Sequence, residues 1–463
     1  MNSVFVRREP SGTSKWATTS RENPGFQIHI PTRPALISGQ RFEGMLGIDL
    51  VIKTTLEIAL AMVLGAMAVI AQASEEHGKE ASAAFAGGAE WIGSGLDGFR
   101  SRLKDYGLTV QLTYTGEAFR SFNLIPDNTT RYRGLVGVHI ALDTGQSGLW
   151  PDGEFFIYGQ NGHGKGFVVN PAGEDLPISN IDAQDFTQIS QFGFKQSFLG
   201  GKARIRLGKQ DVNQIFDVNH FGGDFIFPAY TLIPTIPMPT FPAPGLGTSL
   251  FVEPAGWLSL GAGIYDGDPK IESLGFNTAF DGKGGYFSIF EAACKPGFGA
   301  QNRYAGNYRI GLWHHSGDFA ATGDGSNSKT FSDNSGFYLM FEQPVFKEQH
   351  NDGDDQGLGV FFQFGWAPSD RNPVWRYMGA GFSYKGLFES REHDTLNIGL
   401  NYSWLAGSDP ARNSRTHLTN IEAFYLVRLT SWGSLQPDIQ YYDNPDEDQG
   451  TGFAAGLRWI LQF

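Results

Sequence analysis

Hydrophobic and polar residues alternate with a period of two along many stretches of the chain after residue 107. In residues 108–117 (LTVQLTYTGE), the apolar side chains occupy even positions and the polar ones occupy odd positions. Successive side chains of a β-strand point to opposite faces, so this pattern predicts a strand with one apolar and one polar face. The same alternation recurs in residues 136–143, 203–210, 257–265, 308–312, 358–366, 395–404, 435–442 and 453–463. The chain from residue 108 onwards is therefore predicted to be all-β.

The alternation by itself fits a soluble β-sandwich as well as a membrane β-barrel. Charged and amide residues fill the face predicted to point inward, which favours the barrel. Aromatic residues lie near strand ends on the opposite face, namely Trp366, Tyr402, Trp404 and Trp459, and the chain ends in Phe463. Aromatic rings at headgroup level around a polar, water-filled interior are typical of outer-membrane barrels.

The length of the chain predicts the size of this barrel. If each strand with its connection takes about 22 residues, residues 108–463 hold about sixteen strands. We therefore predict a transmembrane antiparallel β-barrel of about sixteen strands with an aqueous channel. A short amphipathic helix is predicted over residues 91–107, because Leu96, Phe99 and Leu103 share one helical face and Gly107 ends the helix.

An export signal is predicted ahead of the barrel. The longest apolar run, residues 58–70 (IALAMVLGAMAVI), is followed by Ala71-Gln72-Ala73, a small-x-small cleavage site. The run is shorter than the roughly 20 residues of a transmembrane helix. Four segments are therefore expected: an unstructured leader over 1–44, upstream of an alternative start at Met45, a signal peptide over 45–73, a periplasmic segment with the helix over 74–107, and the barrel over 108–463.

Composition excludes several other classes of protein. The chain has 463 residues, a net charge of −13, a pI near 5.2 and a mean hydropathy of −0.24. The acidic balance argues against nucleic acid as a partner, because phosphates require basic clusters. The low hydropathy, with one long apolar run, excludes a bundle of membrane helices. The single cysteine, Cys294, cannot form an intrachain disulfide.

No motif predicts catalysis, a cofactor or a metal. The sequence contains no Gly-x-Ser-x-Gly nucleophile elbow and no Gly-rich phosphate loop before a helix. No carboxylate pair is placed by its spacing alone for glycoside hydrolysis. His314 and His315 are adjacent on a predicted strand and point to opposite faces, so they do not form a two-histidine metal site. We expect neither an enzyme nor a bound cofactor.

Several segments together resemble the carbohydrate-selective porins of the OprB type, from the outer membranes of Gram-negative bacteria. Residues 91–107 are similar to that family's opening Trp-x-Gly-Asp-Trp-Gly-Gly-x-Arg motif, with Ser-Gly-Leu-Asp-Gly at 94–98 in place of Gly-Asp-Trp-Gly-Gly, and the strand 108–117 follows directly. Further matches are residues 207–213 (LGKQDVN), 216–217 (FD), 219–221 (NHF), 224–225 (DF), 436–441 (QPDIQY), 444–445 (NP) and a last strand closing on Phe463.

The resemblance covers about residues 91–463. It implies a monomeric barrel in the outer membrane, surrounded by lipid, that passes glucose and other sugars by diffusion. The C-terminal strand ending in Phe463 resembles the signal that barrel-assembly machinery recognises. Three alternatives stay open at this point: an outer-membrane barrel enzyme, a general non-selective porin, and an exported soluble β-sandwich that binds carbohydrate.

A sugar passage needs hydrogen-bonding groups and flat rings on the channel wall. Arginine suits this role because its planar fork donates to neighbouring hydroxyls. Arg204 and Arg206 are the best pair, since they share one face of one strand, and Trp257 is a candidate stacking ring. For any single residue, the alternative is an ordinary hydrogen bond to a neighbouring strand. The predicted lumen residues are Arg204, Arg206, Arg133, Glu117, Trp257, Arg309, Glu422, Asp438, Gln440 and Arg458.

Residues 226–244 (IFPAYTLIPTIPMPTFPAP) contain too many prolines for a strand ladder, because proline lacks a backbone N–H donor. The segment is predicted to be a long loop. It is either a rigid surface loop or a stiff segment folded into the mouth of the barrel, where it narrows the pore.

Overall fold

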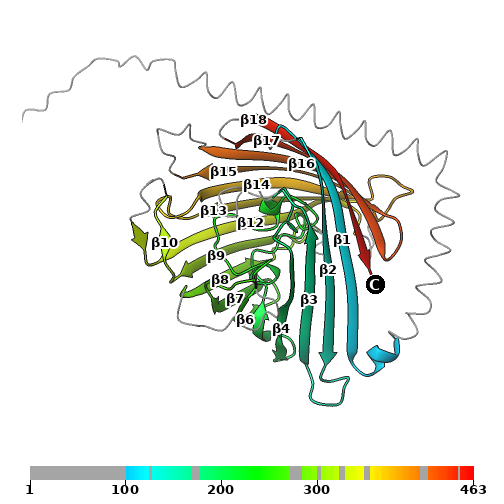
Figure 1. The fold of residues 1–463 in the computed structure, drawn as a ribbon. Coiled ribbons are helices and arrows are strands. Elements are labelled where there is room, and N and C mark those ends of the chain that lie inside the picture. The colour runs from blue at the N-terminus through cyan, green and yellow to red at the C-terminus, as the bar shows by residue number, and fades with distance from the viewer. Residues whose placement is uncertain are drawn as a thin grey trace, which may run out of the picture. The chain divides into compact units, whose positions relative to one another are not determined.

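Sixteen antiparallel strands form a closed barrel (Figure 1). The structure is a computed structural model that describes residues 101–124, 128–167, 178–271, 284–299, 304–322, 329–348, 355–406, 416–446 and 449–463. The predicted leader, signal peptide and most of the predicted helix lie outside the described residues. Residues 101–105 are helical, and Gly107 adopts a φ of +79° while its N–H donates to the Lys104 carbonyl oxygen at 2.9 Å.

The barrel strands follow one another around the wall in chain order. They are β1 (Leu108–Phe122), β2 (Thr130–Asp143), β3 (Gly153–Gly164), β4 (Phe186–Phe198), β5 (Ala203–Gln210), β6 (Gly245–Ala255), β7 (Leu258–Asp266), β8 (Tyr286–Cys294), β9 (Asn307–His315), β12 (Asn334–Lys347), β13 (Gly357–Trp366), β14 (Val374–Lys385), β15 (Thr395–Leu405), β16 (His417–Arg428), β17 (Gly433–Asp446) and β18 (Gln449–Gln462). A small hairpin of β10 (Phe319–Ala320) and β11 (Thr330–Phe331) interrupts this order between β9 and β12. Pairing of β1 with β18 closes the barrel, with Glu117 opposite Arg458.

The outer face of the wall is apolar, as the alternation predicts. Large hydrophobic side chains stay exposed on it, including Leu112, Val138, Ile157, Leu250 and Ile310. Tyr132 on β2 stacks on Trp459 on β18, over the intervening β1, with ring centroids 5.9 Å apart. Apolar groups in this position are stabilised by hydrocarbon instead of water. Among the described residues, no helix is long and apolar enough to cross a membrane.

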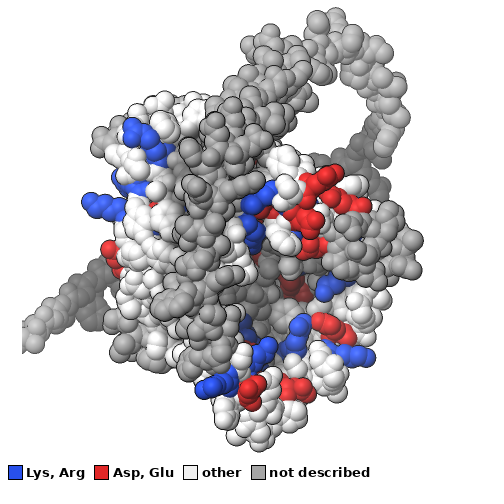
Figure 2. Space-filling view, turned by 90° about the vertical axis from the view of Figure 1, so that its right-hand side faces the viewer, with Lys and Arg blue, Asp and Glu red and all other residues white. Residues whose placement is uncertain are grey.

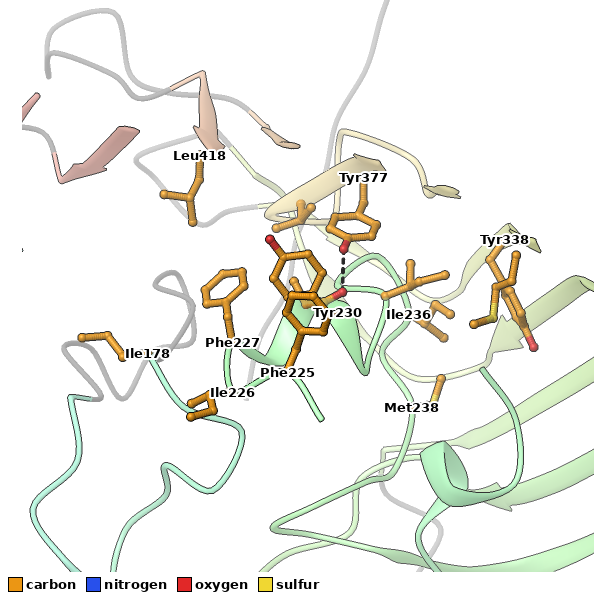
Figure 3. Packing of buried hydrophobic residues seen from close by; sticks show 14 of the residues in the cluster. Ile178, Phe225, Ile226, Phe227, Tyr230, Ile236, Met238, Tyr338, Tyr377 and Leu418 are labelled. Carbon is orange, nitrogen blue, oxygen red and sulfur yellow. Dashed lines mark hydrogen bonds between the residues drawn. The ribbon is translucent and has the colours of Figure 1, made fainter. Parts of the chain in front are cut away.

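The connection between β5 and β6, residues 211–244, turns into the barrel and is called here the inner loop. It contains two short 3₁₀ turns, η1 (Val212–Gln214) and η2 (Pro228–Tyr230). Phe225, Phe227 and Tyr230 are fully buried. The centroid of the Phe225 ring lies 4.2 Å from that of Tyr230 and 5.1 Å from that of Phe424 on β16. Figure 3 shows these side chains packed together with residues of the wall. Of the two alternatives for residues 226–244, the structure has the segment inside the barrel.

Glycines in the wall make room for this packing. A Cβ atom on Gly399 of β15 would lie 2.6 Å from ring atoms of both Phe225 and Tyr230, and one on Gly365 of β13 would lie 2.4 Å from Ile233. Such contacts are closer than real Cβ atoms make, so only glycine fits under the inner loop at these two positions.

A second segment, residues 178–185 of the β3–β4 connection, also lies in the lumen. The backbone N–H of Asn180 donates to the Ile226 carbonyl oxygen at 2.8 Å, and its side-chain amide donates to the Phe225 carbonyl oxygen at 3.0 Å. Ile178 joins the same buried cluster. The lumen is therefore filled from two connections that meet each other.

Candidate functional site: a polar passage beside the inner loop

The two ends of the barrel differ in their connections. At one end, called here the turn end, several connections are short, such as residues 199–202, 256–257 and 429–432. At the other end, called the loop end, residues 165–185, 211–244 and 267–285 form long connections. Outer-membrane barrels have short periplasmic turns and longer extracellular loops, so the turn end faces the periplasm.

Glu422 on β16 holds the middle of the inner loop. Its carboxylate accepts hydrogen bonds from the backbone N–H groups of Ile226 at 2.6 Å and Phe227 at 2.8 Å. The Tyr377 hydroxyl on β14 donates to the Ala229 carbonyl oxygen at 2.6 Å (Figure 3). Glu422 accepts two short hydrogen bonds from consecutive backbone N–H groups, so it is the principal polar anchor of this part of the loop.

Glu342 and Arg309 hold the first part of the inner loop in the same way. Glu342 on β12 accepts from the backbone N–H of His220 at 2.6 Å and of Phe221 at 3.2 Å. Arg309 on β9 pairs with Glu342 at 2.9 Å and donates to the Val218 carbonyl oxygen. Arg309, a predicted lumen residue, and Glu342, which the sequence prediction did not include, both bind protein backbone here.

Glu117, Arg133 and Arg458 lie under residues 178–185. Arg458 pairs with Glu117 at 2.9 Å and donates to the Ser179 hydroxyl at 3.1 Å and the Asn180 side-chain oxygen at 2.7 Å. The Arg133 guanidinium donates to a carboxylate oxygen of Asp185 and to the carbonyl oxygen of Gln184, both at 3.0 Å. Three predicted lumen residues thus position the second inward segment.

Asp438 and Gln440 complete the buried set. The Gln440 amide donates to an Asp438 carboxyl oxygen at 3.0 Å and accepts from the Tyr442 hydroxyl. Each of the following predicted residues is no more than 7 % exposed: Glu117, Arg133, Arg309, Glu422, Asp438, Gln440 and Arg458. All are largely buried, although Arg133 also lines a cavity at the loop end, and their contact with sugar stays a prediction.

Asp182, in the β3–β4 connection, provides a pH test of the inward position of residues 178–185. Burial, and then the charge of Glu117, raise the pKa of Asp182 from 3.8 to about 6, although the Phe167 N–H donates to its carboxylate at 3.1 Å. The neutral form is thus favoured in the folded state. Protonated Asp182 therefore stabilises the folded state relative to the unfolded state. This contribution to the free energy of unfolding is complete below pH 4 and is lost as the pH rises through 6, a change of about 3 kcal/mol.

We expect hydrogen exchange at Asn180 and Ile181 to be slower, after correction for intrinsic rates, at pH 4.5 than at pH 7. In the Asp182→Asn variant this difference should shrink, because the amide does not ionise and still accepts from Phe167. An equal pH dependence in both proteins would show that another group controls the segment.

The open part of the lumen lies along β1–β5, away from the anchors of the inner loop on β12–β16. A cavity of about 300 Å³ opens there near the turn end. Its wall takes one or two residues from each of five consecutive strands, and one from the inner loop. They are Gln111, Thr113, His139, Phe156, Tyr158, Gln191, Lys195, Arg206 and Gln214.

Two further cavities lie along the same part of the wall. The first, of about 310 Å³, shares Lys195, Arg206 and Gln214 with it and adds Arg204 and Phe251. The second, of about 870 Å³, lies at the loop end, and its lining includes Arg131 and the predicted residue Arg133. Figure 2 shows one face of the molecule, where basic and acidic side chains lie together around a hollow. We call the cavities along β1–β6 the polar passage.

Of the predicted residues, only Arg204 and Arg206 line the passage near the turn end. Arg204 pairs with Glu253 at 2.8 Å, and the Arg206 guanidinium lies 4.4 Å from the Phe156 ring centroid. Trp257 is 57 % exposed in the turn between β6 and β7, and it is not among the residues lining the described cavities.

The sequence prediction missed most of the passage lining. It chose mainly charged residues, whereas uncharged residues such as Gln111, Thr113, Tyr158 and Gln191 line much of the cavity. The signal was present for Gln111 and Thr113, because both occupy the polar face of residues 108–117. Among the described residues, no group of three or more His, Cys, Asp or Glu side chains is placed to hold a metal ion.

A closed sixteen-stranded barrel with an apolar exterior, a polar interior and a connection folded into its lumen defines an outer-membrane porin. The family model described as carbohydrate-selective porin, OprB family, matches residues 127–463. The chain therefore belongs to the OprB family of carbohydrate-selective porins, and the predicted family, fold class and outer-membrane location are confirmed.

Known relatives resemble the chain over about half to most of its length. Porin B of Pseudomonas aeruginosa is 22 % identical over 448 residues, covering 85 % of this chain and 95 % of that protein. The putative porin QuiX of Acinetobacter baylyi is 27 % identical over 245 residues, covering 47 % and 55 %. A high-pH structure of Pseudomonas putida OprB has a TM-score of 0.70 and 20 % identity, covering 81 % of this chain and 97 % of that one.

Proposed function

We propose that this porin passes monosaccharides such as glucose by diffusion along the polar passage beside the inner loop. The observation that carries the proposal is the cavity of about 300 Å³ whose wall combines amide, hydroxyl and cationic groups with the rings of His139 and Tyr158. Sugars offer many hydroxyls and a C–H face, and such a wall binds both. Movement down a gradient needs no catalyst, so we propose no enzymatic role.

Planar-bilayer conductance of the detergent-purified, refolded protein tests this proposal. Glucose, a disaccharide and an amino acid are titrated in turn. Discrete channels that glucose closes in a saturable way, with weaker closure by the disaccharide and none by the amino acid, support a sugar-selective porin. Channels indifferent to all three solutes would indicate a general porin, and a folded barrel without channels would favour an enzyme.

Replacing Arg204 and Arg206 together by Ala should widen the channel and weaken its block by glucose. Both side chains line the cavity at the turn end, and Arg206 is held against Phe156. The loss of one or two charge-assisted hydrogen bonds to sugar corresponds to about a tenfold weaker block. Single-channel recording measures both quantities. If conductance and block stay at wild-type values, this arginine pair has a structural role only.

We also propose that the assembly machinery of the outer membrane recognises the C-terminal strand. β18 ends beside Phe463, whose ring stacks on Trp432 at 5.5 Å and whose N–H donates to the Leu112 carbonyl oxygen at 2.8 Å. The last residue thus lies at the seam that closes the barrel, on a wall whose apolar exterior suits lipid.

A further inference from the structure

Arg206 is a cation without a carboxylate partner in the polar passage. Its two cationic neighbours are neutralised: Lys195 pairs with Glu154 at 2.5 Å, and Arg204 pairs with Glu253 at 2.8 Å. The polar contact of Arg206 is a hydrogen bond from Nη2 to the Gln191 side-chain oxygen at 3.0 Å. Its buried Nε has no hydrogen-bond partner, and no ion pair joins Arg206 to a carboxylate among the described residues.

The surroundings hold this guanidinium in one orientation. It lies 4.4 Å from the centroid of the Phe156 ring, and the Lys195 ammonium lies 5.0 Å from the same centroid. Asp211, a nearby acid, is already engaged, because its Oδ1 accepts from the Thr240 hydroxyl at 2.6 Å and from the Asn213 N–H at 3.1 Å. Stacking on an aromatic face orients a planar cation and leaves its remaining N–H groups available.

Both cations line the cavity of about 300 Å³, together with hydroxyl and amide groups. A positive charge in such a partly desolvated place is stabilised when a ligand brings the missing anion. Thr113 and Gln111 from β1 and Gln214 from the inner loop line the same cavity, and groups of these kinds bind sugar hydroxyls. The cavity thus combines an unsatisfied cation with a wall suited to a polyhydroxylated body.

We propose that this part of the passage is a subsite for sugar acids, monosaccharide-sized solutes that carry one carboxylate. The carboxylate lies against Arg206, beside Lys195, and the hydroxyl-bearing chain or ring lies against Thr113 and Gln214. This inference rests on the proposed function, since it names a class of solute that the same passage prefers. A neutral sugar uses the same wall but leaves the cation without its counterion.

The test is channel block at about 0.1 M KCl, where screening by salt is limited. Gluconate, glucose and inorganic phosphate are titrated against wild-type protein and the Arg206→Gln variant. In the wild type, gluconate should half-block the channel at a concentration about tenfold lower than glucose, because the carboxylate adds a charge-assisted hydrogen bond. In Arg206→Gln this preference should disappear, because block by gluconate weakens about tenfold more than block by glucose.

Two variants serve as controls. Arg206→Lys keeps the charge and should keep a reduced preference for gluconate. The double variant Arg204→Gln/Glu253→Gln removes a neighbouring ion pair without changing the net charge, and it should keep the full preference. Heat-modifiable migration on gels confirms that each variant is a folded barrel.

The inference is overturned if gluconate and glucose block the wild type equally, or if the preference survives Arg206→Gln. Block by phosphate as strong as block by gluconate would also overturn it, because the site would then select any small anion. A channel that neither sugar closes would instead contradict the proposed function itself.

Discussion

Replacing Glu422 with Ala is expected to release the middle of the inner loop, raise the single-channel conductance and weaken block by sugars. The carboxylate receives two backbone N–H groups, from Ile226 and Phe227, at 2.6 and 2.8 Å in a fully buried place. Removing the acceptor leaves two buried backbone N–H groups without a partner, at roughly 1–3 kcal/mol each, so the substitution destabilises the inward position of the loop by about 2–6 kcal/mol. The strand ladder does not depend on these bonds, and the barrel should still form.

Tyr377→Phe is the matched control for this experiment. It removes one neutral hydrogen bond, to the Ala229 carbonyl oxygen, from the same part of the loop and costs about 1 kcal/mol. We expect its conductance to stay near the wild-type value. If Glu422→Ala and Tyr377→Phe give the same single-channel conductance, the apolar packing around Phe225 holds the loop and Glu422 is not its anchor.

Replacing Arg458 with Met should lower the thermal stability of the barrel at its closing seam. The side chain pairs with Glu117 across β1 and β18 and also binds Ser179 and Asn180 of the second inward segment. Its removal leaves the Glu117 carboxylate buried without a counterion, which costs about 3–5 kcal/mol. The measurement is the temperature at which the fast-migrating folded band converts to the unfolded band on a gel.

The double variant Glu117→Gln/Arg458→Met should recover much of this loss, because no buried charge then lacks a partner. Arg376→Met controls for the effect of replacing any arginine in the wall by methionine. Arg376 lies over the rings of Trp375 and Trp404 and belongs to no ion pair among the described residues. A loss in the double variant as large as in Arg458→Met would mean that the bonds to Ser179 and Asn180, not the buried charge, account for the effect.

The fold was predictable because the alternation is a local property of the chain. In residues 108–117 the even positions lie on the outside and the odd ones face the lumen, and this same pattern places Glu117 opposite Arg458 when the barrel closes. The expected size of about sixteen strands is confirmed by the closed sheet. Neither prediction needs contacts between distant segments.

The interior was predictable only in part, since alternation shows which side chains face inward and not what they meet there. Glu422 and Ile226 are 196 residues apart, and nothing in either segment indicates their hydrogen bond. The apolar residues of 225–230 were a usable signal, because a loop in water rarely carries so many rings. Gln214 could not be predicted for a similar reason, since it lines the passage only when the inner loop has folded into the lumen.

The glycines under the inner loop affect how the width of the channel can change in evolution. Gly365 and Gly399 belong to the side of the wall on which Ile233, Phe225 and Tyr230 pack, opposite the strands that line the passage. A larger residue at either glycine would displace the loop toward the solute without altering any group that the solute meets. The size cut-off of such a channel can therefore evolve separately from its chemical preference, through substitutions that no permeating molecule ever touches.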